Sequence, residues 1–198
     1  MKFTQIPENT FKNIQLNAGV LLKAFVPDTG TLKATDILGA TSGGANFTAT
    51  PSFTDFGEDI DNCPANMKEL KVLDGWEAKM SGTFVTVTAG LAVKLTGAAD
   101  ESDGKITPRN ELKASDFADL WWVGDYSEIN EDGTDGGGSA GFCAIHLLNS
   151  LSTGGFQIQS SKKGKGQLAF EFTGHYSMDA PETVPFEIYI KEGTEAAA

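Results

Sequence analysis

Short runs in which apolar and polar residues alternate dominate the sequence. The clearest early run is GGANFTATPSFTDF, residues 43–56, and a period of two is typical of a strand with one buried face. Its polar face holds Asn46, Thr48, Thr50 and Ser52, and its apolar face holds Phe47, Ala49, Pro51 and Phe53. Because proline lacks the N–H that a ladder needs, Pro51 predicts an edge strand or a bulge.

A second run, DGWEAKMSGTFVTV at residues 74–87, predicts another two-faced strand. Asp74-Gly75 has the composition of a turn and is expected to open it. The apolar side holds Trp76, Ala78, Met80 and Phe84, and the polar side holds Glu77, Lys79, Ser81 and Thr83.

Helical periodicity is limited to two places. A short helix is predicted over residues 89–98, where Thr88 caps the start, Leu91 and Leu95 share a face, and Gly97 signals the end. A second helical turn is expected in LKASDFADL, residues 112–120, with Ser115 as its cap. The aromatic run LWWVGDY that follows predicts a buried strand.

Four more strands are predicted in the last third of the chain: FCAIHLLNSL, GFQIQS, QLAFEFTGHY and VPFEIYIKE. The middle two would be joined by a turn that carries Lys162, Lys163 and Lys165. Residues 127–141 predict a mobile surface loop, and residues 193–198 a frayed tail. We therefore expect one mainly β domain over residues 1–198, a β-sandwich or barrel with one flanking helix and long loops.

Composition narrows the classes of function. The chain has 198 residues, 40% of them hydrophobic, which is enough for the core of one domain. It has no apolar run of membrane-span or signal-peptide type, so we expect it to stay inside a cell and to bind no membrane. Cys63 and Cys143 predict free thiols. A formal net charge of −12 opposes tight binding of nucleic acid.

No motif predicts an enzyme, a cofactor or a metal. GGSAG, residues 137–141, matches the string around a hydrolase nucleophile, but Ser139 lies in a glycine-rich loop where a strand–turn–helix is needed. His146 and His175 have no carboxylate or cysteine at ligand spacing. GEDIDN, residues 57–62, lacks the spacing of a calcium loop and predicts a solvated acidic loop.

The order of the motifs carries more information than any one of them. The succession ILGATSGGANFTATPSFTDFGEDIDNCP, KELKVLDGWEAKMSGTFVTVT, LSTGGFQIQSSKKGKGQLAFEFTGHYSMD and VPFEIYI closely resembles the major tail tube proteins of long-tailed phages and related prophages. The resemblance runs from about Ile6 to Glu192. It implies a β-sandwich with a flanking helix, whose copies form rings of six that stack into a hollow tube for the genome.

The resemblance also implies a location and partners. The protein would be part of the virion tail, assembled in the host cytoplasm, beside tape measure, terminator and distal tail proteins. Double-stranded DNA would pass through the tube without specific binding. A ring of six chains carries six times −12, or −72, formal charges, and any share of them facing the lumen repels phosphates.

Two sets of residues are candidates for contacts in such a tube. By analogy, the lumen wall would be formed by polar strand residues, namely Thr48, Thr50, Ser52, Glu77, Lys79, Ser81 and Thr83; a solvated outer surface would suit them equally well. Contacts between rings would pair an acidic loop with the lysine turn. The acidic residues are Asp55, Glu58, Asp59 and Asp61, and the basic ones are Lys162, Lys163 and Lys165.

Two alternatives stay open. The lysine turn could only protect a sheet edge from unwanted pairing. The same β-sandwich could instead be a monomeric binding module of a baseplate or cell surface, holding a carbohydrate or peptide on Trp76, Trp121 and Trp122.

Overall fold

A computed structural model describes residues 14–15, 17–125 and 141–192 and confirms a mainly β fold with one α-helix. The strands are β1 (Val20–Leu22), β2 (Thr41–Asp55), β3 (Lys71–Phe84), β4 (Ala99–Ser102), β5 (Lys105–Pro108), β6 (Ala118–Asp125), β7 (Phe142–Ser152), β8 (Leu168–Thr173) and β9 (Phe186–Lys191). The helix α1 spans Ala89–Thr96, and single 3₁₀ turns occur at Ala34–Asp36, Lys68–Leu70 and Ala114–Asp116. None of the described helices is long and apolar enough to cross a membrane.

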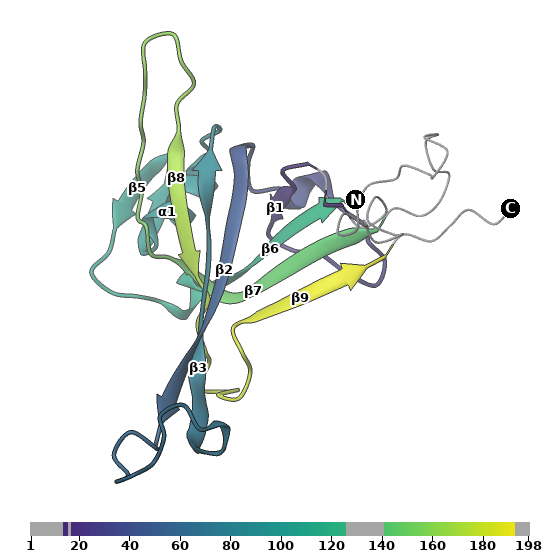
Figure 1. The fold of residues 1–198 in the computed structure, drawn as a ribbon. Coiled ribbons are helices and arrows are strands. Elements are labelled where there is room, and N and C mark those ends of the chain that lie inside the picture. The colour runs from purple at the N-terminus through teal and green to yellow at the C-terminus, as the bar shows by residue number, and fades with distance from the viewer. Residues whose placement is uncertain (1–13, 16, 126–140, 193–198) are drawn as a thin grey trace, which may run out of the picture.

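The strands form two antiparallel layers that share β7 (Figure 1). The first half of β7 pairs with β6 and β9, and β1 extends that layer beyond β6. The last residues of β7, Leu151 and Ser152, instead pair with β8, which continues into β3 and β2. Asn149, with a positive φ of 46°, falls in the register irregularity between the Leu120–Leu147 and Ala118–Ser150 pairs, shortly before β7 passes into the second layer.

The main core lies between these layers and under α1. Met80 and Phe84 of β3 are fully buried, and the ring of Phe84 packs on Phe170 of β8 with centroids 4.6 Å apart. From the other layer, Leu120 and Leu147 meet the same cluster. The alternation predicted for residues 76–84 is confirmed, since Ala78, Met80 and Phe84 are buried.

The predicted helix is confirmed, although it ends two residues earlier than expected. The Thr88 hydroxyl oxygen accepts a hydrogen bond from the Leu91 N–H at 3.2 Å, which satisfies one free donor of the first turn. Gly97 ends the helix with a φ of 85°, a conformation that favours glycine. Leu91 and Leu95 both point into the main core.

Three local predictions were wrong. Asp74-Gly75 lies inside β3 as a bulge, because Ser52 pairs with Gly75 and Phe53 with Leu73. The helical turn expected within residues 112–120 is present as a single 3₁₀ turn, Ala114–Asp116, but its cap is Lys113, where Ser115 was predicted.

The third wrong prediction is the strand GFQIQS. Among the described residues that segment forms no ladder, and its one bridge joins Gln159 to Gln167. The sequence reading also missed the hairpin β4–β5, which turns at Asp103-Gly104 with positive φ at both residues. The predicted loop at 127–141, apart from Gly141, and the predicted tail at 193–198 lie outside the described residues.

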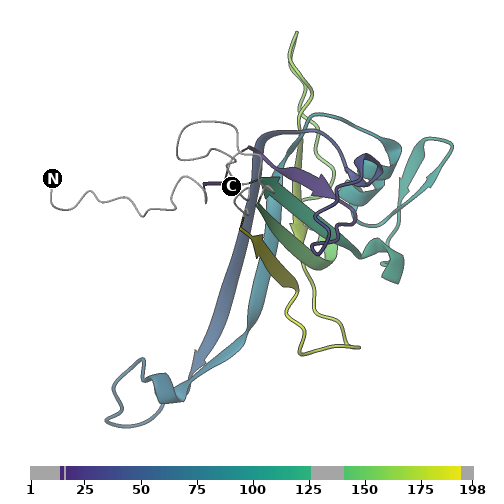
Figure 2. The ribbon, with the colours of Figure 1, turned by 90° about the vertical axis from the view of Figure 1, so that its right-hand side faces the viewer.

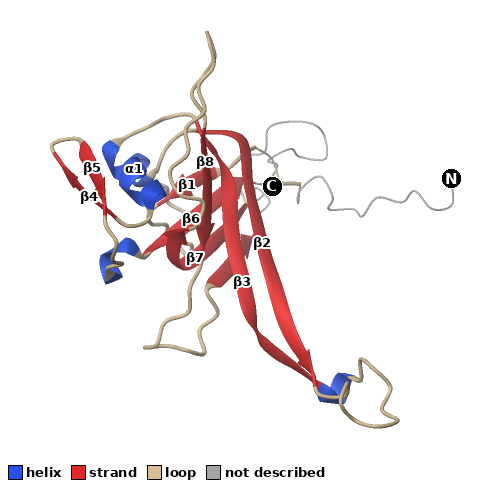
Figure 3. Cartoon of the chain, turned by 90° about the vertical axis from the view of Figure 1, so that its left-hand side faces the viewer, coloured by secondary structure: helices blue, strands red, loops and turns tan. Residues whose placement is uncertain are grey.

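The β2–β3 hairpin extends well beyond the rest of the described chain (Figures 2 and 3). We call residues 52–75 the arm and residues 56–70 its tip. β2 is an edge strand of the sheet, as Pro51 predicted. In the body the apolar face of the hairpin packs on Phe186, but in the arm Phe53 and Leu73 are 52% and 46% exposed.

The buried face of α1 provides a test of the core. Leu95→Ala should lower the free energy of unfolding by about 2–5 kcal/mol, because Leu95 is fully buried and its removal leaves a cavity. The matched change Leu112→Ala, at a residue 58% exposed, should cost less than about 1 kcal/mol. Urea denaturation followed by circular dichroism measures both, and equal losses would show that α1 is not seated in the core.

Candidate assembly surfaces

The seven residues predicted to line a lumen share one face of the β2–β3–β8 layer. Thr48 pairs with Lys79 and Thr50 with Glu77, and directly paired residues of antiparallel strands point to the same side. Ser52, Ser81 and Thr83 follow at intervals of two along the same strands, so their side chains lie on the side opposite the buried core residues. The geometry therefore brings these residues together into one polar face.

β8 and the chain before it add residues to this polar face that the sequence reading missed. Thr173 pairs with Lys79, and Glu171 pairs with Ser81. The Thr153 hydroxyl donates to Glu171 Oε1 at 3.0 Å and lies 2.9 Å from the Thr173 hydroxyl. The alternation in LAFEFT, with Glu171 and Thr173 opposite the phenylalanines, was the signal that could have found two of them.

The polar face has one described ion pair. Lys79 forms an ion pair with Glu77 on the same strand. The hydrogen bond to Glu77 raises the pKa of Lys79, and the charge of Glu171 contributes in the same direction. The charged residues described on this face are thus two glutamates and one lysine.

An open concavity lies on the arm beside its tip, and it combines apolar and acidic residues. Its lining consists of Phe53, Thr54, Asp55, Glu58, Asp59, Asn66 and Lys71, which we call the acidic groove. Lys71 Nζ lies 5.3 Å above the Phe53 ring and is the one basic side chain in this lining. Asp61 is exposed but is not part of the lining.

Asp55 differs from the other acidic residues predicted to contact a neighbouring ring, because its carboxylate is used within the chain. Its carboxylate accepts hydrogen bonds from the backbone N–H groups of Gly57 and Asn66, both at 2.9 Å. These two bonds hold the pKa of Asp55 below its usual value. Asp55 therefore shapes the tip, whereas Glu58 and Asp59 are the residues free to face a partner.

The predicted lysine turn forms the far end of the long connection between β7 and β8. Lys162, Lys163 and Lys165 are all exposed, and Gly164 N donates to Ser161 O at 3.1 Å to close the turn. Figure 1 shows this lysine loop (residues 155–166) at the top of the molecule and the tip of the arm at the bottom. The basic and acidic surfaces therefore lie at opposite ends of the described chain.

The three tryptophans do not form a shared exposed platform. Trp121 is 7% exposed and belongs to a second apolar cluster, which lies against β6 and β7. The indole N–H of Trp122 donates to Ala18 O at 3.1 Å, and Trp76 packs edge-on against Phe186. Each ring is thus occupied by contacts within the chain.

Among the described residues, folding brings His146 close to two carboxylates. Its ring stacks on Trp121 at 3.9 Å, and its Nδ1 lies 3.2 Å from Glu187 Oε2. Its Nε2 lies 3.2 Å from Asp119 Oδ2, without hydrogen-bond geometry. No local pattern in the sequence predicts this cluster, because Asp119, His146 and Glu187 come from three different strands. Within the described ranges, no group of side chains could hold a metal ion.

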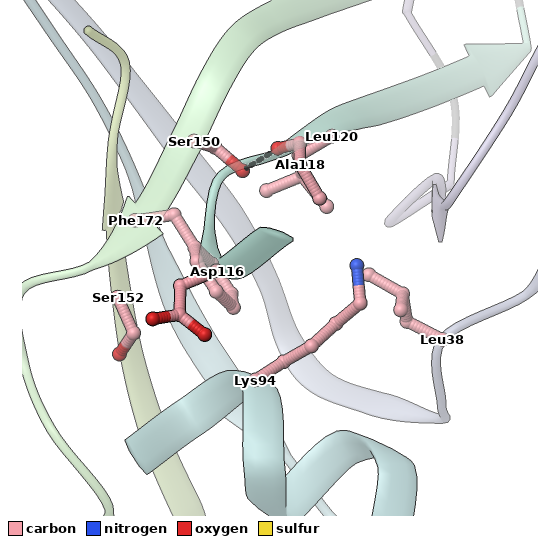
Figure 4. Close-up of a pocket in the computed structure, with 8 residues that line it drawn as sticks. All are labelled: Leu38, Lys94, Asp116, Ala118, Leu120, Ser150, Ser152 and Phe172. Atoms are coloured by element: carbon pink, nitrogen blue, oxygen red, sulfur yellow. Dashed lines mark hydrogen bonds between the residues drawn. The ribbon is translucent and has the colours of Figure 1, made fainter. Parts of the chain in front are cut away.

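A small cavity lies between α1 and the sheet (Figure 4). The Lys94 ammonium points toward Leu38 and away from Asp116. Burial lowers the pKa of Lys94, and the charge of Lys23 adds to that effect. The hydroxyls of Ser150 and Ser152 donate to backbone carbonyls, and Asp116 pairs with Arg109. The serines and Asp116 are thus satisfied, and the lining residues have no arrangement of nucleophile and base.

Both cysteines are free, as the sequence predicted, and both are partly buried. Ser139, the weak candidate nucleophile, lies outside the described residues. No known family of sequences matches the chain, and no curated protein matches it significantly.

The cluster around His146 predicts a dependence of stability on pH. The Tyr189 hydroxyl donates to Glu187 at 2.6 Å, and this bond, together with the contact to His146, lowers the pKa of Glu187 from its usual 4.5. A lowered pKa gives stability that is present above 4.5 and disappears as the pH falls through the lowered value. Glu187→Gln should therefore cost up to about 1 kcal/mol at pH 6, since the side chain is 46% exposed, and almost nothing at pH 2.

Urea denaturation at the two pH values measures this difference. Glu182→Gln is the matched control, because Glu182 is exposed on the β8–β9 connection. A loss for Glu187→Gln that stayed constant from pH 6 to pH 2 would contradict the assignment.

Proposed function

We propose that this protein is a non-enzymatic structural subunit that polymerises into the tube of a phage tail, as stacked rings of six. The observation that carries the proposal is the separation of the acidic groove from the lysine loop. A subunit with opposite charges at its two ends favours head-to-tail contacts, which repeat along an axis and do not close on themselves. The resemblance of the motif order to tail tube proteins supports the same function.

In this proposal the polar face of the β2–β3–β8 layer lines the lumen. Its two glutamates and one lysine give a net charge of −1 for each copy, so a ring of six would present about six negative charges to the lumen from this face. This is a small share of the −72 of the whole ring. Repulsion of DNA phosphates would act within about 8 Å, and the hydroxyl groups would keep the wall wet.

The free edge of β2 supports lateral assembly. β2 is 15 residues long and pairs only with β3 among the described strands. An exposed edge of this length invites pairing with another chain, and a neighbouring copy in a ring would remove it. The subunit would then be completed by its neighbours on both sides.

The remaining partners follow from the same proposal. The tube would contact tape measure, terminator and distal tail proteins in the virion tail, after assembly in the host cytoplasm. It would let double-stranded DNA pass and would use no cofactor. The alternative of a monomeric binding module has less support, because the tryptophans it would use are occupied by Phe186, His146 and Ala18.

Electron microscopy of the purified protein tests this function. At high concentration we expect hollow rods of constant diameter, and we expect no binding of duplex DNA at micromolar protein and physiological salt. Dispersed particles at every concentration tried would contradict the proposed function and favour a monomeric module.

Charge reversal tests the contact between the two ends. Changing Lys162, Lys163 and Lys165 to Glu should raise the protein concentration needed for rods about tenfold at low salt, since exposed pairs contribute up to about 1 kcal/mol each. Adding Glu58→Lys and Asp59→Lys in the same chain should restore growth by reversing both ends. Light scattering measures the threshold.

The control for this experiment has the same change in net charge at other exposed lysines: Lys23→Glu, Lys33→Glu and Lys105→Glu. We expect it to leave the threshold much closer to that of the wild type. The proposed contact between the acidic groove and the lysine loop would be contradicted if this control impaired growth as strongly as the change at Lys162, Lys163 and Lys165. It would also be contradicted if reversing both ends gave no recovery.

A further inference from the structure

The direction of the arm depends on contacts at its base. The last pair between β8 and β3 is Thr173 with Lys79, and beyond it β3 pairs only with β2 among the described strands. A two-stranded ribbon is marginally stable in water and twists strongly. The arm therefore needs a further contact with the body to leave it at a fixed angle.

The bulge at Asp74 ties the two strands of the arm to each other. Thr54 Oγ1 donates to Asp74 Oδ2 at 2.9 Å, and Ser52 Oγ donates to Gly75 O at 3.4 Å. A bulge bends the strand that carries it. Both bonds lie within the hairpin, so they do not fix its angle to the body.

Tyr176 makes a polar contact at the base of the arm, beside the packing of Trp76 on Phe186. Its phenol oxygen accepts a hydrogen bond from Trp76 N at 2.9 Å, one residue from the bulge. Gly174 N donates to Ala78 O at 2.9 Å, so the chain after β8 continues alongside β3. A Cβ at Gly75 would lie 3.5 Å from the same phenol oxygen, which places that oxygen in contact with the backbone at the bulge.

The residue before Tyr176 is fastened to β7, the strand shared by the two layers. His175 N donates to Leu148 O at 3.2 Å, and Asn149 Nδ2 donates to His175 O at 3.2 Å. Nδ1 of the His175 ring lies 3.1 Å from Asn149 O, and the ring packs against Phe117 in a T-shaped arrangement. Tyr176 therefore connects the base of the arm to the most central strand of the fold.

We infer that Tyr176 is a positioning residue, whose hydroxyl fixes the angle of the arm and so aims the acidic groove at the next copy. This inference rests on the proposed tube. The Tyr176 hydroxyl accepts the hydrogen bond of the Trp76 N–H, as the backbone of a neighbouring strand would. The ladder between β3 and β8 ends at Lys79, so β8 does not reach Trp76.

Hydrogen exchange on the monomer, below the concentration at which rods form, tests the contact itself. Tyr176→Phe removes only the acceptor, so the Trp76 amide should exchange about two- to tenfold faster, the effect of one net hydrogen bond. Tyr189→Phe is the matched control, because it removes a phenol hydrogen bond to Glu187, away from the arm. Equal Trp76 exchange in the two variants would overturn the inference.

Light scattering then tests the effect on assembly. Tyr176→Phe should raise the threshold concentration for rods several-fold above that of Tyr189→Phe, with both variants still folded by circular dichroism. Faster Trp76 exchange with an unchanged threshold would show that the hydroxyl does not position the groove. If wild-type protein formed no rods, the proposed function would fail, while the exchange experiment would still decide whether Tyr176 holds the arm.

Discussion

The structure depends on the β2–β3 hairpin, which has one apolar and one polar face. This hairpin extends beyond the body that its apolar face covers (Figures 2 and 3). In the body, Met80 and Phe84 of that hairpin are fully buried against β6, β7 and α1. The opposite side of the same strands is polar over three strands, so it must face water. In the arm, the apolar face continues through Phe53 and Leu73 without a second layer, which leaves surface for a further contact.

This constraint explains why strand patterns predicted so much of the fold. The alternation at residues 46–52 and 76–84 predicted both faces of the hairpin, and Pro51 predicted its edge position. The cap at Thr88 is a local interaction, so the helix could also be placed from sequence. Each of these features is decided by residues that are close together in the chain.

The errors come from features that depend on distant residues. Asp74-Gly75 has the composition of a turn, but pairing with Ser52 and Phe53 makes it a bulge. GFQIQS alternates like a strand, but within the described ranges it forms only the isolated bridge of Gln159 with Gln167. The acidic and lysine segments could be found by composition, whereas their placement at opposite ends required the fold. The cluster of Asp119, His146 and Glu187 had no sequence signal, since register alone brings the three strands together.

The hydrogen bonds that Asp55 accepts from Gly57 and Asn66 have a consequence for how a partner would meet the tip. They tie Gly57 and Asn66, near the two ends of the loop, to Asp55 within a single chain, so less conformational entropy remains to be lost when a second surface arrives. Association with a preformed loop can approach the rate set by diffusion and orientation, because no folding step has to come first. The rate at which a polymer of such subunits grows would then be set by how often subunits meet its end by diffusion.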